Sequence, residues 1–194
     1  FRPISPIWQL QIKRELHILD KFLKLVNKSG LDISNDNYIK KLIQDVLQNP
    51  LDEWPNDNFF EIMALAQHYN LPTQALGWSY DYRVALYFAV RNILENDDND
   101  GVVWAFNYKL FENNENCKLH FHNPKYYLHQ DLKAQSTLFT FIVNNDFNFD
   151  QRPFDEIIVE DYIDDLNGVE LNNENLFYKF IIPNEYKHEI LNDL

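Results

Sequence analysis

The sequence predicts an α+β fold in which an N-terminal helical half packs on a mixed or antiparallel sheet. Through most of residues 4–94, apolar residues recur three or four positions apart with charged residues between them, which is typical of amphipathic helices. Beyond residue 101 the apolar runs become β-branched and aromatic, and Asn- and Asp-rich connections separate them, as expected for strands joined by turns. Helices followed by strands indicate α+β rather than a repeated parallel βα unit.

Four helices are expected in the first half of the chain, each from its apolar spacing and its flanking residues. The first is expected at Ile4–Asn27, the second is capped by Ser34 or Asn35 and runs to Gln48, and the others are expected at Asn58–Tyr69 and Asp81–Leu94. Asp81 is the expected N-cap of the last one, because a carboxylate can accept hydrogen bonds from the free backbone N–H groups of the first turn.

Strands are expected at Val102–Tyr108, Thr137–Val143, Glu156–Glu160 and Leu176–Ile182. Residues 73–79 are too short and too mixed for a helix, and they end in Trp78-Ser79, which indicates a further short strand. Residues 184–194, after a proline, are expected to form a short terminal helix.

Composition predicts one domain with an aromatic core. The chain has 194 residues, 45% of them hydrophobic and 15% aromatic, and a chain of this length buries roughly 70% of its unfolded surface. Its net charge of −13 makes general binding to a nucleic-acid backbone or to an anionic membrane unfavourable. The early basic residues Lys13, Arg14, Lys21, Lys24 and Lys28 are interpreted as the solvated face of the first helix.

Cysteine content and hydropathy predict a cytoplasmic setting and no membrane partner. Cys117 is the single cysteine, and no apolar run approaches the roughly 20 residues of a membrane helix. The chain begins at Phe1 without a Met, so we expect it to be a processed chain or part of a longer one.

Polar and aromatic residues gather at the junction between the third and fourth helices. Gln67 and His68 end the third helix, where an imidazole can meet unsatisfied carbonyls or act as an acid or base. Trp78, Ser79 and Tyr80 lie between a short strand and a helix, where a hydroxyl and backbone amides can receive a phosphate or a ribose. Each interpretation has a structural alternative. His68 can be a histidine that only stabilises a helix end, and Ser79 can be part of an ordinary helix cap.

His120 and His122 alternate on an extended segment, with Cys117 and His129 nearby. Alternate residues of a strand share a face with or without a metal, so we expect no metal there. Metal-dependent hydrolysis around His120 and His122 remains an alternative that metal analysis can test.

Residues 64–89, ALAQHYNLPTQALGWSYDYRVALYFA, resemble the signature of FRG domains, a-x-A-Q-H-x-G-L-P-T-R-L-L-D-W-T followed by P-x-x-A-L-x-F-A. The family is named for a Phe-Arg-Gly element, and the chain opens with Phe1-Arg2; residues 132–139 resemble its R-x-x-A-Q-x-G-x-F-T segment. The three segments occur in the family's order and imply a single FRG-like domain over residues 1–194.

Four of the chain's departures from the family pattern concern glycines or charged residues. Pro3 and Asn70 stand where the family has glycine, and Asn tolerates the left-handed conformation that such a glycine adopts. Gln74 and Gly77 stand where the pattern has Arg and Asp. Loss of both members of a possible ion pair leaves no unpartnered buried charge.

The resemblance implies an ADP-ribosyltransferase-like fold with NAD as substrate. In that layout Arg2 would hold the pyrophosphate, Ser79 and Tyr80 would contact the nicotinamide ribose or ring, and Gln135 would orient the ribose 2′-hydroxyl. Gln135 and His68 are then the catalytic candidates, and Arg2, Gln67, Trp78, Ser79 and Tyr80 are the NAD-binding candidates.

The function implied is transfer of ADP-ribose from NAD to a macromolecular acceptor, as a toxin or phage-defence effector. A neutral amide such as that of Gln135 can position a hydroxyl but cannot stabilise a developing cation as a carboxylate can. A non-catalytic module that senses a nucleotide or binds a partner protein with the same fold is therefore the alternative. NAD binding without turnover would distinguish it.

Overall fold

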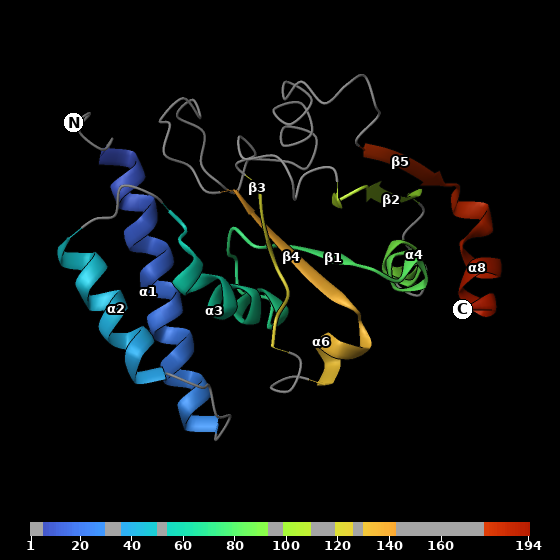
Figure 1. Cartoon of the computed structure of the whole chain (residues 1–194). Helices are drawn as coiled ribbons and strands as arrows, with labels where there is room; N and C mark the ends of the chain where they lie inside the picture. Colours follow the sequence, from blue (N-terminus) through green and yellow to red (C-terminus); the bar gives the residue numbers. More distant parts are fainter. Residues whose placement is uncertain are drawn as a thin grey trace.

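The computed structural model describes residues 6–29, 36–49, 54–92, 99–109, 119–125, 130–142 and 177–194. Figure 1 shows α1 and α2 at one side of the molecule, α3 beside them, the strands beyond α3, and α8 at the opposite side. The elements in chain order are α1 (Pro6–Ser29), α2 (Asp36–Gln48), α3 (Asp57–His68), β1 (Leu76–Ser79), α4 (Tyr82–Val90), β2 (Gly101–Phe106), β3 (Leu119–His122), α6 (Gln130–Ala134), β4 (Thr137–Ile142), β5 (Phe177–Ile182), the 3₁₀ turn η3 (Asn184–Tyr186) and α8 (Lys187–Asp193).

The α1 helix is amphipathic, as its spacing predicts. Its buried side chains recur every three or four residues: Ile12, Leu16, Leu19, Leu23 and Val26. The basic side chains of Lys13, Arg14, Lys21, Lys24 and Lys28 are exposed, which confirms that they form a solvated face. The helix that the sequence predicts at 4–27 extends to Ser29.

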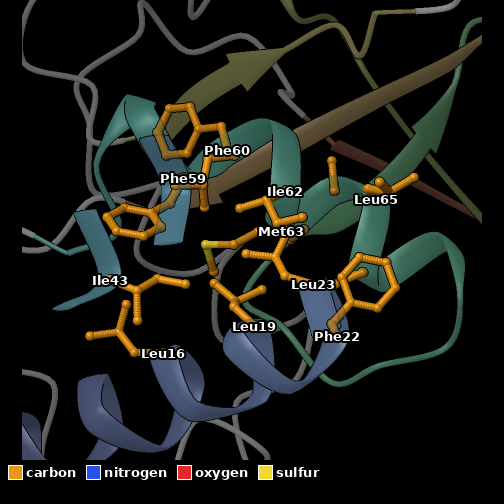
Figure 2. Packing of buried hydrophobic residues seen from close by; sticks show 14 of the residues in the cluster. Leu16, Leu19, Phe22, Leu23, Ile43, Phe59, Phe60, Ile62, Met63 and Leu65 are labelled. Carbon is orange, nitrogen blue, oxygen red and sulfur yellow. The ribbon is translucent and has the colours of Figure 1, made fainter. Parts of the chain in front are cut away.

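The main core lies where α1, α2 and α3 meet. Figure 2 shows Leu19 and Leu23 of α1 close to Met63 of α3, and Leu16 of α1 beside Ile43 of α2. All five side chains have 1% or less of their surface exposed. Removing this much apolar surface from water is the main stabilising contribution in the helical half.

The helical half packs on the strands through α3. The Phe60 ring of α3 stacks on the Phe141 ring of β4, with centroids 4.2 Å apart and planes 10° apart. Leu132, Phe139 and Phe141 belong to the same buried cluster as the helices. The α+β arrangement predicted from the sequence is thus observed, with α3 as the element that joins helices to sheet.

Two antiparallel sheets are present among the described residues. The first has the order β1-β4-β3, and the second pairs β2 with β5. In the first sheet Ser79 lies opposite Thr137, and His122 lies opposite Phe139. The predicted sheet is therefore antiparallel, and it occurs as two small sheets rather than one.

The β2–β5 ribbon packs closely on α4 at Gly101. A Cβ atom added to Gly101 would lie 2.6 Å from the backbone oxygen of Ala89, the penultimate residue of α4. Any side chain at this position would force strand and helix apart, so glycine is required there by space rather than by its φ angle.

The sequence predicts most of the described elements but misses two short ones. The last strand and the terminal helix occur as β5, η3 and α8, whereas β3 and α6, of four and five residues, were not predicted as elements. The strand expected at 156–160 lies outside the described residues. Across the described ranges, no helix is both long enough and apolar enough to cross a membrane.

A pair of leucines on α1 tests the core. Leu19 is 1% exposed and Leu25 is 62% exposed. Leu19→Ala should lower the free energy of unfolding by about 2–5 kcal/mol, because it removes buried methyl groups and leaves a cavity. Leu25→Ala should change it by less than about 0.5 kcal/mol. Urea denaturation of both variants measures the difference, and equal losses would contradict this packing.

Candidate functional site

A cluster of partly exposed aromatic rings bridges the two sheets. We call it the aromatic cluster; it consists of Trp78 of β1, Phe106 of β2, Phe121 of β3, Phe177 of β5, and the loop residues Tyr80 and Tyr108. None of the six rings is fully buried. Rings that remain accessible after packing against one another are suited to contact a flat ligand.

Phe106 is the centre of the aromatic cluster. Its ring centroid lies 4.4 Å from Trp78, 5.3 Å from Phe177 and 6.2 Å from Phe121. Tyr108 continues the cluster from Phe121, at 6.2 Å, to Tyr80, at 5.6 Å. Tyr80 is 50% exposed, so the cluster ends at the protein surface.

Hydrogen bonds fix the rings of Trp78 and Tyr80. The indole N–H of Trp78 donates to the hydroxyl of the buried Thr140, 2.9 Å away. The Tyr80 hydroxyl lies 3.3 Å from the side-chain oxygen of Asn123, just beyond β3. Both rings are therefore oriented before any ligand arrives, which reduces the entropy lost on binding.

Ser79 joins β1 to the segment that carries Gln135. Its hydroxyl donates to the backbone oxygen of Gln135 at 2.7 Å and accepts from the backbone N–H of Asp81 at 3.0 Å. Asp81 then caps α4 by accepting from the Arg83 N–H, as the sequence predicts. The Ser79 hydroxyl thus already has a donor role and an acceptor role within the protein.

The turn between α6 and β4 brings Gln135 to this junction. Ser136 adopts a left-handed φ of 47°, and its backbone oxygen accepts from the Tyr80 N–H at 3.0 Å. Trp78, Ser79, Tyr80 and Gln135, which the sequence selects from two separate segments, therefore lie together. Their roles toward a ligand stay predictions.

Gln67 holds the loop that leads into β1. Its side-chain oxygen accepts from the N–H of Thr73 at 3.2 Å and from the Thr73 hydroxyl at 3.1 Å. The same hydroxyl accepts from the Ala75 N–H at 3.3 Å. Asn70 begins this loop with a φ of 60°, the left-handed conformation expected where the family pattern has glycine.

The remaining predicted residues lie elsewhere or outside the described ranges. The ring of His68 packs against Tyr69, with centroids 5.4 Å apart, and Tyr69 packs against Phe22 of α1. Its contacts are thus on the side of the helical half. Arg2 lies outside the described residues, so its predicted role toward a pyrophosphate stays a prediction.

A histidine–carboxylate pair that the sequence did not indicate links α3 to β3. His122 Nε2 lies 2.7 Å from Glu61 Oε2, and Glu61 Oε1 accepts from the Lys125 N–H at 3.0 Å. Burial alone would raise the pKa of Glu61, but the bonds from His122 and Lys125 outweigh it and lower the pKa below its usual 4.5. These partners are 61 residues apart, so no local pattern identifies them.

The described residues near His120 and His122 do not provide a set of metal ligands. Among the described residues, no group of three or more His, Cys, Asp or Glu side chains could hold an ion. His120 packs against the Phe60 ring at 5.9 Å. Cys117 and His129 lie outside the described residues.

Gln74 is directed at a buried carboxyl group on α1. Its side-chain N–H₂ donates to Glu15 Oε2 at 2.8 Å, and the Trp54 indole N–H donates to the same oxygen at 2.5 Å. Burial raises the pKa of Glu15 to about 7, although both hydrogen bonds act to lower it. The side chain at position 74 therefore contacts α1. An ion pair between the two family residues would instead require it to contact position 77.

The buried Glu15 carboxyl should make stability depend on pH. Its pKa is near 4.5 unfolded and about 7 folded, so its contribution is complete below pH 4.5 and declines as pH rises to about 7. The loss amounts to about 3 kcal/mol at most. Glu15→Gln should remove this slope, which urea denaturation at several pH values measures. Parallel curves for the two proteins between pH 5 and 7.5 would contradict the assignment.

Comparison with protein-family models gives a match over residues 9–98. Residues 9–98 match the FRG domain, and this range includes α1, α2, α3, β1 and α4 together with the Gln67–Tyr80 segment. Neither the curated proteins nor the solved structures gave a match. The match over residues 9–98 therefore supports the resemblance of this segment to the FRG domain family.

Proposed function

We propose that this chain is a cytoplasmic, ADP-ribosyltransferase-like FRG domain that binds NAD and transfers ADP-ribose to a macromolecular acceptor, as a toxin or phage-defence effector. The observation that carries the proposal is the partly exposed aromatic cluster beside the Ser79–Gln135 junction. An aromatic surface next to hydroxyl and amide groups matches the mixed apolar and polar character of a nucleotide.

NAD has two flat heterocycles, which aromatic side chains bind by stacking. Tyr80 is half exposed and oriented by Asn123 and Tyr108, so its ring is the accessible end of the cluster. We assign the nicotinamide or its ribose to this end. Trp78 supports the same surface from β1 through its contact with Phe106.

The chemistry proposed is cleavage of the bond between nicotinamide and ribose. Nicotinamide leaves with the bonding electron pair, a nucleophile of the acceptor bonds to the ribose carbon, and its proton passes to solvent. Gln135 is the residue proposed to hold the ribose 2′-hydroxyl as positive charge develops on the sugar. Its amide can accept or donate a hydrogen bond there without adding charge.

Two exposed tyrosines, one in the aromatic cluster and one outside it, test the proposed ligand surface. Tyr80→Ala should weaken NAD binding at least about fivefold, because a base stacked on an aromatic ring gains about 1–3 kcal/mol. Tyr82→Ala removes a ring that is 72% exposed at the start of α4 and should change the affinity less than about twofold. Calorimetry with NAD measures both. Absence of NAD binding to the wild-type protein would overturn the proposal.

Gln135→Glu tests the proposed transfer step. A carboxylate at this position can stabilise the developing ribosyl cation, so nicotinamide release from NAD should rise at least tenfold over wild type. Gln135→Leu, which keeps the size but removes the polar end, should abolish release. Equal rates in wild type and both variants would contradict the assignment of Gln135.

A nucleotide sensor without transferase activity is the second candidate. The Ser79 hydroxyl is engaged in both directions by Gln135 and Asp81, and Gln135 carries no charge, so the junction has little to offer a reaction. This candidate predicts NAD or ADP-ribose binding that Tyr80→Ala weakens, with no nicotinamide release in wild type or in Gln135→Glu.

A further inference from the structure

The Glu15 carboxyl connects three segments in one hydrogen-bonded group. Glu15 belongs to α1, Trp54 precedes α3, and Gln74 lies in the loop before β1. Both donors bond to the same carboxyl oxygen, Oε2. The proposed chemistry makes no use of this group.

The two donors to Glu15 are neutral, and the described surroundings supply no opposing charge. The faces that α2 and α3 turn toward α1 are apolar, with Ile39 and Ile43 from α2 and Phe59 and Met63 from α3. The charged side chains beside Glu15 on its own helix, Arg14 and His17, are exposed. Of the titratable side chains on the packed helices, Lys41, Asp45 and Asp57 are exposed, Lys40 and His68 are partly exposed, and Glu61 bonds to His122.

Gln74 lies just before the strand that contributes to the ligand surface. The residue after it, Ala75, is buried, and β1 begins at Leu76. Trp78 and Ser79 of that strand contribute to the aromatic cluster and to the Gln135 junction. A displacement of Gln74 would therefore shift the strand on which the candidate site is built.

We propose that Glu15 is a positioning residue: its neutral form holds Gln74, and with it β1, in the place that ligand binding requires, so that binding weakens as pH rises through neutrality. The proposal rests on the proposed function in taking NAD as the ligand. The residue does not touch the ligand and acts only through Gln74.

The physical reason is the cost of a buried charge. A neutral carboxyl group accepts the two hydrogen bonds at little expense, whereas a carboxylate in the same place loses its hydration without gaining a cation. Release of the Gln74 loop lets water reach the carboxylate and relieves this cost. The burial that raises the pKa of Glu15 to about 7 places this change at neutral pH.

The first test needs no ligand. The indole N–H resonance of Trp54, assigned by loss in Trp54→Phe, should shift between pH 5.5 and 8.5 with a midpoint near 7. In Gln74→Arg the guanidinium supplies a permanent counter-charge, so the midpoint should fall by at least one unit. Glu15→Gln should show no transition. A Trp54 resonance that is constant over this range in wild type overturns the proposal.

The second test couples this titration to the ligand. The Kd for NAD should rise about tenfold between pH 6 and pH 8 in wild type, since one linked proton allows at most tenfold per pH unit. In Gln74→Arg and Glu15→Gln the change should stay below about twofold. Glu189→Gln, which alters an exposed carboxyl on α8, should keep the wild-type pH dependence. A wild-type Kd that is independent of pH while Trp54 titrates overturns the positioning role and leaves NAD binding intact.

Absence of NAD binding at both pH values contradicts the proposed function. The positioning role of Glu15 is then tested by a third measurement, which needs no ligand. The Trp78 indole N–H, bonded to Thr140, reports on β1 directly. Its resonance should follow the Trp54 transition in wild type and remain constant in Gln74→Arg. A constant Trp78 resonance in wild type overturns the positioning role.

Discussion

The burial of α3 on almost all of its sides is the constraint on which the rest of this structure depends. Phe59, Phe60 and residues 62–66 are buried, with α1 and α2 on one side and β4 on the other. Two polar side chains of α3 have defined partners at its edges. Glu61 bonds to His122 of β3, and Gln67 bonds to Thr73, so one apolar helix sets the position of a strand on one side and of the β1 loop on the other.

Local patterns predicted the long elements because they encode burial directly. Spacing of three or four residues identified α1, and the carboxylate of Asp81 identified the start of α4. The order β1-β4-β3 could not be predicted, because it depends on pairing between distant segments with no shared pattern. The contact of Gln74 with Glu15, 59 residues away, was missed for the same reason.

Some residues of the candidate site could likewise be predicted from the sequence, and others could not. Trp78, Ser79, Tyr80 and Gln135 could be selected from sequence because they lie in recognisable segments, and the β1–β4 pairing brings them together. Phe106, Phe121 and Phe177 could not, because an aromatic residue in a strand has the same pattern whether it packs in a core or borders a ligand surface. Only the contacts between sheets show that these rings and Trp78 form one cluster.

The pairing of β2 with β5 has a consequence for how the protein is made. Gly101 lies opposite Ile182, so the ribbon closes only after residue 182 has left the ribosome. The helical core, formed by residues 12–75 and completed by α6 and β4, uses mostly earlier contacts, and contacts between nearby residues form faster than distant ones. Phe177, a member of the aromatic cluster, arrives with β5. The cluster is therefore completed only once β5 has been synthesised, and a nascent chain cannot bind through it before then.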